Sequence, residues 1–545
     1  MLTDDARYAA LLTRDPRFDG VFFVGVSTTG IYCRPICPAR TPGRARCTFY
    51  RTPAQAEAAG FRACFRCRPE LAPGSSELGS VDAVDALVQA AARKITEGAL
   101  NEASVDDLAA ELGVSARHLR RATEARLGVS PVELAQTRRL ALAKQLLQDT
   151  ALPLTEIAFA AGFGSVRRFN AAFIETMGKA PSLLRRAHVE VAPPAEALEL
   201  RLDYRPPYAW DELLAFLRAR AVPGVERVDR DSYRRNVRLG EHRGAIAVRQ
   251  ASRRDALVLS VAPSLLPALM PLVAHVRRMF DLDARPDVIA RVLGADRTLG
   301  PLVRARPGLR LPGAIDPFEA SVRALLGQQV SVAAATTLAG RFATAFGQTY
   351  AGGDGLERVF PTAAEVARLS PEAIAAIGLP GARAAAMHGF ARAIVSGALS
   401  LGAGELDPFV EQAVALPGIG PWTAHYLAMR ALHLPDAFPA SDLGIKKALS
   451  ATPRAAEERA AAWRPFRSYA VMHLWTSLGD THADDHDEHL VPARTAAPVR
   501  ARRGADRRVP AGSRAGAARP AGGRARAHDA RARARRGAAA RVLRR

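Results

Sequence analysis

The chain has no cysteine after Cys67, although it is 545 residues long, and it has no long apolar run anywhere. The C-terminal half therefore lacks the thiolates that a four-cysteine iron–sulfur cluster needs, and we expect no such cluster. No stretch reaches the length of about 18 apolar residues that suggests a transmembrane helix. The N-terminus, MLTDDARYAALLTRDP, also lacks the basic-then-apolar order of a signal peptide. These absences predict a cytoplasmic protein without membrane contact.

Length and charge favour several domains and an anionic partner. A chain of 545 residues exceeds what one hydrophobic core holds, which predicts about three to five domains. The formal net charge of +22 is most often matched by nucleic acid. However, residues 491–545 contain 17 Arg and only 2 Asp, so this tail supplies +15 of that charge. The rest of the chain is only moderately basic.

The composition and the periodicity change along the chain. Short linker-like stretches stand at 74–80 (GSSELGS) and 192–197 (APPAEA). Between them, apolar residues at three-and-four spacing predict helices alone. Alternation in LELRLDYRPPYAW, SYRRNVRLG, GAIAVR and DALVLSVA then predicts strands, and helical periodicity returns from Phe318 to Leu478. We expect a mainly α, multidomain fold with small α+β parts, divided at 1–75, 82–189, 197–308, 309–480 (all-α) and 481–545.

The cysteines predict a metal site. Cys33 and Cys37 form a C-x3-C pair, and Cys64 and Cys67 form a C-x2-C pair 27 residues later. Two such pairs typically close one tetrahedral zinc site. The spacing alone leaves two readings open: a purely structural Zn2+, or a Zn2+ that keeps a reactive cysteine as the nucleophilic thiolate. Cys47 lies outside both pairs and is assigned no role.

The residues around these cysteines resemble a known family. STTGIYCRPICPARTP, followed by CTFY and AAGFRACFRCRPE, looks like the N-terminal zinc domain of Ada, a bacterial methylation sensor. The resemblance covers about residues 1–73. It implies that Cys33 accepts a methyl group from a methylphosphotriester in DNA, and that Thr29 and Arg40 contact the DNA backbone. Methylation of one thiolate removes a negative charge facing phosphate, which should strengthen DNA binding.

Two segments have the pattern of a helix-turn-helix. In SVDDLAAELGVSARHLRRATEARLG, Gly113 allows the turn and Ser115 is placed to cap the second helix. LTEIAFAAGFGSVRRFNAAFIETMGKAP repeats this arrangement about 50 residues later. The side chains placed to read bases or hold phosphates are Arg117, Arg120, Arg167, Arg168 and Asn170. An ordinary helical bundle with solvated basic faces is the alternative.

Residues 83–188 as a whole resemble the AraC-type DNA-binding domain. The signatures GF-x-S-x-x-x-F and G-x-x-P are both present. The resemblance implies binding to promoter DNA, with RNA polymerase as a candidate partner, and hence a nucleoid-associated regulator.

The motif LPGIGPWTAHYLAMR, residues 416–430, predicts a helix-hairpin-helix. Gly418 and Gly420 permit a tight turn whose backbone N–H groups can bind a DNA phosphate. A plain glycine-rich helix connection is the alternative. Asp442 follows 22 residues after Gly420, at the spacing found in helix-hairpin-helix DNA glycosylases. Taken alone, this Asp reads as a helix N-cap.

Residues 200–480 resemble AlkA, the inducible 3-methyladenine DNA glycosylase. The resemblance rests on LDYRPPYAWDELLAFLRARAVPGVE, RPGLRLPGAIDPFEASVRALLGQQVSVAAA, the hairpin and RPFRSYAVMHLW. It implies that Asp442 is the catalytic carboxylate and that Trp422, Tyr426 and Trp475 are the aromatic walls of the base pocket. Gln329 stands where some members carry a leucine wedge.

Two further features define the expected reaction. Members that also cut the strand carry a Schiff-base lysine two residues after the hairpin, and Trp422 occupies that place here. The resemblance therefore implies a monofunctional DNA-3-methyladenine glycosylase II. The methyltransferase half of Ada, with its Pro-Cys-His motif, is absent from the sequence, so reversal of O6-alkylguanine is not expected.

The leading hypothesis is a methylphosphotriester-sensing regulator fused to this glycosylase. One alternative is a regulator whose AlkA-like half binds DNA without excising bases. Another is a zinc-stabilised enzyme that the helix-turn-helix only tethers. Residues 481–545 contain no Lys and no apolar periodicity, so we expect a disordered basic tail. It is either a DNA-attracting arm or, as we favour, a segment without a selected role produced by a shifted reading frame.

Overall fold

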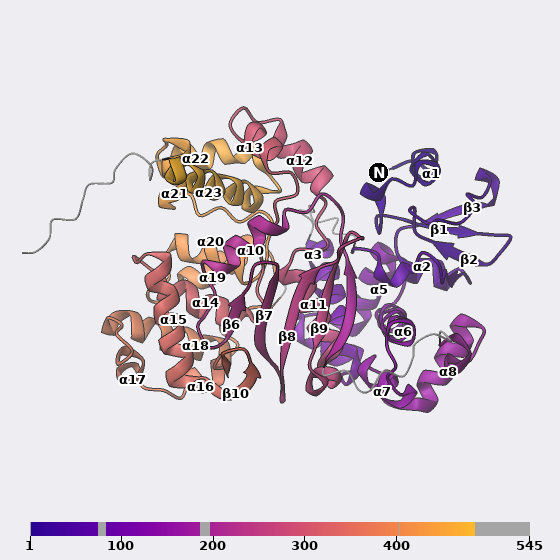
Figure 1. Cartoon of the computed structure of the whole chain (residues 1–545), viewed down its shortest axis with the longest axis horizontal. Helices are drawn as coiled ribbons and strands as arrows, with labels where there is room; N and C mark the ends of the chain where they lie inside the picture. Colours follow the sequence, from indigo (N-terminus) through magenta and orange to yellow (C-terminus); the bar gives the residue numbers. More distant parts are fainter. Residues whose placement is uncertain (1, 75–82, 186–196, 403, 485–545) are drawn as a thin grey trace, which may run out of the picture. The chain divides into compact units, whose positions relative to one another are not determined.

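The computed structural model describes residues 2–74, 83–185, 197–402 and 404–484, and Figure 1 gives the element labels. The predicted linkers at 75–80 and 192–196, and the predicted tail from residue 485, lie outside the described residues. Helix α23 (Arg467–Asp484) continues to residue 484, so the start of the predicted tail at 481 is helical and our boundary was too early. Among the described helices, none is long and apolar enough to cross a membrane.

The cysteine-containing segment is a small sheet with two helices. Its strands β1 (Phe23–Val26), β2 (Ile31–Cys33), β3 (Cys47–Tyr50) and β4 (Arg62–Ala63) lie in the order β3-β1-β2-β4. Helix α1 (Asp4–Thr13) begins where Thr3 accepts a hydrogen bond from the Ala6 N–H, and α2 (Pro53–Ala58) is capped by Thr52 in the same way. Only β2 and β4 pair in parallel, which places Cys33 beside the segment that carries Cys64.

The second segment is entirely helical, as the periodicity predicted. Its helices are α3 (Ala83–Thr96), α4 (Val105–Glu111), α5 (Ala116–Leu127), α6 (Pro131–Asp149), α7 (Leu154–Ala160), α8 (Val166–Met177) and α9 (Pro181–Leu184). Capping boxes start α4 at Ser104 and α6 at Ser130. The turn between α4 and α5 uses Gly113 at φ +71°, a conformation that glycine adopts without steric cost.

The third segment is built on a five-stranded antiparallel sheet. Its strands are β5 (Leu198–Asp203), β6 (Glu226–Val228), β7 (Ser232–Leu239), β8 (His242–Gln250) and β9 (Ala256–Val261), in the order β5-β9-β8-β7-β6 (Figure 1). The alternation in the sequence predicted all of these strands except the short β6. The helices α10 (Trp210–Arg218), α11 (Leu269–Met279), α12 (Pro286–Gly294) and α13 (Leu299–Ala305) complete the segment.

The fourth segment is helical apart from one hairpin. Its helices before the glycine-rich motif are α14 (Pro317–Leu326), α15 (Val332–Phe346), α16 (Ala363–Val366), α17 (Pro371–Ala375), α18 (Gly381–Val395) and α19 (Leu406–Val414). After the motif come α20 (Pro421–Arg430), α21 (Leu443–Leu449), α22 (Pro453–Ala460) and α23. The antiparallel pair β10 (Gln348–Gly353) and β11 (Leu356–Val359) was not predicted: it lies within a stretch read as helical throughout, although its turn, Gly353-Asp354-Gly355, is a composition that favours hairpins.

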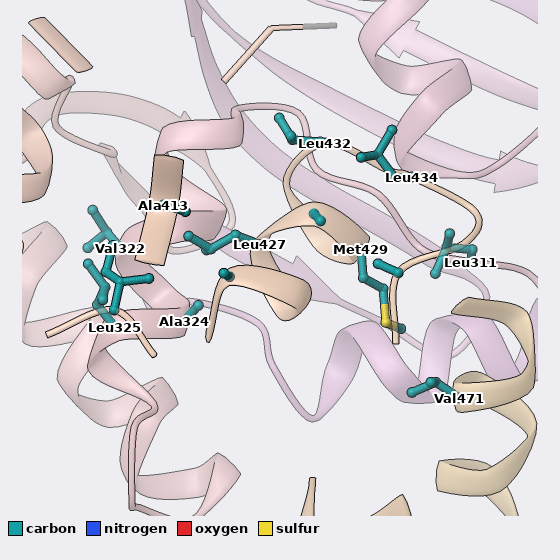
Figure 2. Close-up of a cluster of buried hydrophobic side chains, with 14 of the residues drawn as sticks. Leu311, Val322, Ala324, Leu325, Ala413, Leu427, Met429, Leu432, Leu434 and Val471 are labelled. Atoms are coloured by element: carbon teal, nitrogen blue, oxygen red, sulfur yellow. The ribbon is translucent and has the colours of Figure 1, made fainter. Parts of the chain in front are cut away.

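The hydrophobic core of this segment fixes helix α20, which follows the motif. Figure 2 shows Leu427 of α20 pointing towards Val322 and Leu325 of α14, with Ala413 of α19 close by. All four side chains are fully buried or nearly so. A buried Leu is worth about 1.5–3 kcal/mol relative to an exposed one, so this contact holds α20 firmly. The same packing fixes the position of the N-terminus of α20.

Candidate functional site

The glycine-rich motif forms a tight turn between α19 and α20. Gly418 has φ +82°, and a Cβ added there would lie 2.5 Å from the Cβ of Ala386, so the position requires glycine. Gly420 is the N-cap of α20 and has no side chain to accept a bond from the first N–H groups of the helix. These groups, at the positive end of the helix dipole, are suited to an external anion such as phosphate.

A residue that the sequence did not single out holds this turn. The side-chain amide of Gln328 donates hydrogen bonds to the carbonyl oxygen of Gly418 (3.0 Å) and to Oγ1 of Thr423 (3.1 Å). Its neighbour Gln329 is exposed at φ +57° in the loop between α14 and α15. Gln329 is not among the residues that line the cavity described below, whereas Val330 is.

Asp442 caps a helix and also lines a cavity. Its Oδ1 accepts hydrogen bonds from the backbone N–H of Ile445 (3.1 Å) and from Nε1–H of Trp475 (2.8 Å). Its Oδ2 accepts from Nε1–H of Trp422 (3.0 Å). The two interpretations of this residue from the sequence, cap and functional carboxylate, are thus compatible in one side chain.

The three predicted aromatic residues lie together beside this carboxylate. Trp422 and Tyr426, one turn apart on α20, are stacked with ring centroids 5.2 Å apart and an interplanar angle of 23°. Tyr426 and Trp475 of α23 are 6.2 Å apart at 39°. All three rings, together with Asp442, line a cavity of about 410 Å³, which is large enough for a purine.

Two arginines that line this cavity were missed. Arg220 and Arg430 both lie over the ring of Phe216, with guanidinium carbons 3.8 Å and 4.6 Å from its centroid. Burial lowers the pKa of both arginines, that of Arg430 to about 10. In the sequence nothing separates them from the many surface arginines, because only tertiary structure brings α10 next to α20.

A buried ionic network supports the cavity wall. Arg323 of α14 donates to Glu226 (3.0 Å) and Glu319 (3.2 Å), and Arg235 of β7 donates to Glu319 (2.5 Å). Burial opposes ionisation of Glu226, but Arg323 and Arg235 more than offset it and lower its pKa. The network joins the sheet to α14 and fixes the position of the loop that follows α14.

The four predicted metal ligands converge. The sulfur atoms of Cys33, Cys37, Cys64 and Cys67 all lie within 4.8 Å of one another. Sulfurs that share a tetrahedral zinc at about 2.3 Å are about 3.8 Å apart, so the cluster fits that ion. Backbone N–H groups also face the sulfurs: that of Arg34 donates to Cys67 (3.3 Å) and that of Arg66 to Cys64 (3.4 Å). Such bonds stabilise thiolates.

Within the cluster, Cys33 is the most accessible ligand. It is half-buried, whereas the other three are buried. Thr29 and Arg40 are both exposed on the same small segment. Cys47 is buried on β3 and is not part of the cluster.

The predicted DNA-reading helices carry their polar residues outward. Ser115 accepts from the N–H of His118 and starts α5, and Ser165 accepts from the N–H of Arg168 and starts α8. The exposed or half-exposed side chains on these helices include Arg117, Arg120, Arg167, Arg168 and Asn170.

Four family models match successive parts of the chain. They are the metal binding domain of Ada at residues 6–70, a helix-turn-helix domain at 108–187, the AlkA N-terminal domain at 199–316, and the HhH-GPD superfamily of base excision DNA repair proteins at 322–462.

Curated proteins with the same modules are also similar. A probable bifunctional transcriptional activator/DNA repair enzyme AlkA from Mycobacterium tuberculosis is 42% identical over 484 residues, covering 86% of this chain and 96% of the relative. DNA-3-methyladenine glycosylase 2 of Escherichia coli is 38% identical over 281 residues, which are 51% of this chain and 97% of that protein. The bifunctional transcriptional activator/DNA repair enzyme Ada of E. coli is 33% identical over 191 residues, 35% of this chain and 51% of that protein.

Proposed function

The chain belongs to the family of bifunctional transcriptional activators and DNA repair enzymes that joins Ada and AlkA modules, and from this we propose that it both senses and repairs DNA alkylation. Its C-terminal half is a DNA glycosylase. We propose that this half is monofunctional and releases alkylated bases of the 3-methyladenine type. The observation that carries the proposal is the Asp442 carboxylate in an aromatic-lined cavity next to the hairpin.

The cavity suits a base that has left the DNA stack. Flat aromatic faces bind a purine by stacking, and they attract the positive charge that alkylation gives it. The C1′–N bond then breaks with its electron pair leaving on the base, and the sugar becomes oxocarbenium-like. The Asp442 anion stabilises that charge, and water adds to C1′ and loses a proton to solvent. The products are a free base and an abasic site.

The cavity also supports base release without strand cleavage. A Schiff-base mechanism needs a lysine amine at C1′. Among the described residues that line the cavity there is no lysine, and Trp422 stands at the position two residues after the hairpin.

Asp442→Asn is expected to slow the release of 3-methyladenine from methylated duplex DNA by about 10²–10³-fold, because the neutral amide does not stabilise the sugar cation. Asp407→Asn makes the same substitution at an exposed site on α19 and serves as the control. Chromatography of the freed base, with gel analysis of the strands, measures both steps. Absence of release by the wild-type chain would instead favour a regulator whose AlkA-like half only binds DNA.

The N-terminal half is proposed to report damage. One zinc ion, held by Cys33, Cys37, Cys64 and Cys67, keeps their sulfurs as thiolates when it is bound. The Cys33 sulfur attacks the methyl carbon of a methylphosphotriester, the O–CH3 bond breaks, and its electron pair stays on the phosphate oxygen. Thr29 and Arg40 hold the backbone nearby. The helix-turn-helix residues then bind promoter DNA, and RNA polymerase is the proposed partner there. We propose a cytoplasmic, nucleoid-associated protein with the domains expected from the sequence, except that the last helix of the glycosylase domain runs to residue 484.

After exposure to DNA carrying methylphosphotriesters, mass spectrometry is expected to find one methyl group, on the peptide containing Cys33. Cys33→Ser should abolish the mass gain, whereas Cys47→Ser should leave it intact because Cys47 is outside the cluster. A wild-type chain that binds this DNA and gains no methyl would leave the zinc with a structural role alone.

A further inference from the structure

Three donors occupy three of the roughly four acceptor positions of the Asp442 carboxylate. Trp475 and Ile445 donate to Oδ1, and Trp422 donates to Oδ2. The three donors come from α23, α21 and α20. The carboxylate is therefore held by three separate elements, and its plane is set before any substrate arrives.

The fold constrains the N–H edges of the Trp422 and Trp475 rings more tightly than the faces of these rings. One face of Trp422 is stacked on Tyr426, which leaves at most the other for a base. The edge of Trp475 lies against the backbone of Gly444: a Cβ added at Gly444 would be 3.0 Å from Cδ1 and 3.2 Å from Nε1 of that ring. A glycine two residues after Asp442 thus lets the Trp475 N–H reach the carboxylate.

Hydrogen bonds to an ionised carboxylate are stronger than neutral ones, and they are most useful where the anion must not reorient during the reaction. We propose that Trp422 and Trp475 are positioning residues that act through Asp442 by their indole N–H groups, in addition to any contact of their faces with the base. This inference rests on the proposed glycosylase function. It gives the two tryptophans a role in the step that follows base binding.

The two roles are separated by DNA probes that carry no base at the central position. In one probe a cationic pyrrolidine replaces a deoxyribose, and in the other a neutral tetrahydrofuran does. An aromatic wall has no base to contact in either probe, whereas an oriented carboxylate favours the cation. Because aromatic faces also attract a cation, the part of the preference for pyrrolidine over tetrahydrofuran that Asp442→Asn removes measures the Asp442 anion.

Trp422→Phe and Trp475→Phe each keep an aromatic ring and remove one N–H donor. In each full-length variant the pyrrolidine preference is expected to fall about tenfold or more, as for the loss of one hydrogen bond to a charged group. The kcat for base release should fall by a similar factor, with a smaller change in KM.

Trp463→Phe is the matched control. Trp463 lies in the same helical segment as Trp422 and Trp475 and donates its Nε1–H to Oδ2 of Asp296 (3.0 Å), but it does not line the cavity. This variant should keep the wild-type preference between the probes even if it is less stable. Folding of every variant is checked by circular dichroism.

The outcomes separate the inference from the function it rests on. If the wild-type chain releases base and prefers pyrrolidine, but both Trp→Phe variants keep that preference, the positioning role is wrong and the glycosylase function stands. If the wild-type chain neither releases base nor distinguishes the probes, the proposed function itself fails.

Discussion

At the scale of single residues, the arginines of the cavity affect how a damaged base is expected to lie. Arg220 and Arg430 add positive charge to the lining of the cavity, where both contact Phe216. Asp442 lies elsewhere on its wall, and it is the carboxylate that accepts from the two indoles. Because like charges repel at this range, a cationic purine should turn its charged part towards Asp442 and away from the arginines.

A second buried aspartate is expected to make stability depend on pH. Asp281 accepts hydrogen bonds from Leu311 N–H (3.1 Å) and from the Tyr469 hydroxyl (2.9 Å), and Nε2 of His433 is 3.4 Å from its Oδ1. Burial outweighs the opposing effects of Arg310 and these donors, and it raises the pKa of Asp281 to about 7. Burial also lowers the pKa of His433, to about 3, so this ring is neutral at pH 7.

An unfolded Asp has a pKa of about 3.9, so folding raises the pKa of Asp281. Its contribution to stability is then fully present below about pH 4 and is lost as the pH rises to 7. One such proton changes the free energy of unfolding by up to about 1.4 kcal/mol per pH unit in that window. Asp281→Asn should remove this contribution, so that the variant loses less stability, or gains more, than the wild type as the pH rises from 4 to 7.

Denaturant titrations followed by tryptophan fluorescence measure this effect in one half of the chain. All four tryptophans, at 210, 422, 463 and 475, belong to the glycosylase half. Equal pH profiles for the wild type and the Asn variant would mean that Asp281 keeps its usual ionisation when buried.

At the scale of elements, the turn before α20 depends on one glycine more than on the other. Gly418 has a left-handed backbone and no room for a Cβ, whereas Gly420 has φ −87° and nothing within 4 Å of an added Cβ. Gly418→Ala is expected to lower the free energy of unfolding by at least about 2 kcal/mol, from backbone strain and overlap with Ala386. Gly420→Ala should cost less than about 1 kcal/mol.

The variants Gly418→Ala and Gly420→Ala also test whether the turn binds DNA. Displacing the turn moves the N–H groups of α20, so Gly418→Ala should also weaken the binding of undamaged duplex DNA, measured by fluorescence anisotropy. Unchanged affinity in a variant with a displaced turn would argue that phosphate is bound elsewhere. Gly420→Ala controls for the loss of a glycine from the motif.

At the scale of the whole molecule, the zinc module and the glycosylase half are expected to differ in their need for metal. Residues 2–74 have only small buried clusters of their own besides the cysteines, and small modules of this kind usually need their metal to fold. DNA-3-methyladenine glycosylase 2 of E. coli matches the C-terminal half of this chain over 97% of its own length, so that relative has no counterpart of the zinc module.

Removing zinc from the full chain with a strong chelator should therefore expose residues 2–74 to proteolysis and leave base release within about twofold of its starting rate. Zinc loss is followed with a colorimetric indicator, and base release is assayed in the same samples. A loss of base release in parallel with the loss of zinc would mean that the metal module supports the enzyme directly.

The sequence alone determined the features that depend on local pattern. Cysteine spacing identified the metal cluster, because its two pairs of ligands each lie within a few residues of chain. Alternation predicted four of the five strands of the β5–β9 sheet, and a capping residue placed the start of α5 at Ser115, since both depend on neighbours along the chain. Family resemblance supplied Asp442 and the three aromatic residues, which the structure brings together.

Tertiary structure decided what depends on distant segments. The approach of α10 to α20 placed Arg430 on Phe216, and the meeting of three helices gave Asp442 two indole donors. No local pattern marks these residues, because an arginine or a tryptophan is equally common on a surface or in a core. Their chemistry is set by which side chains the fold places within a few ångströms, and that is fixed by packing over the whole glycosylase half.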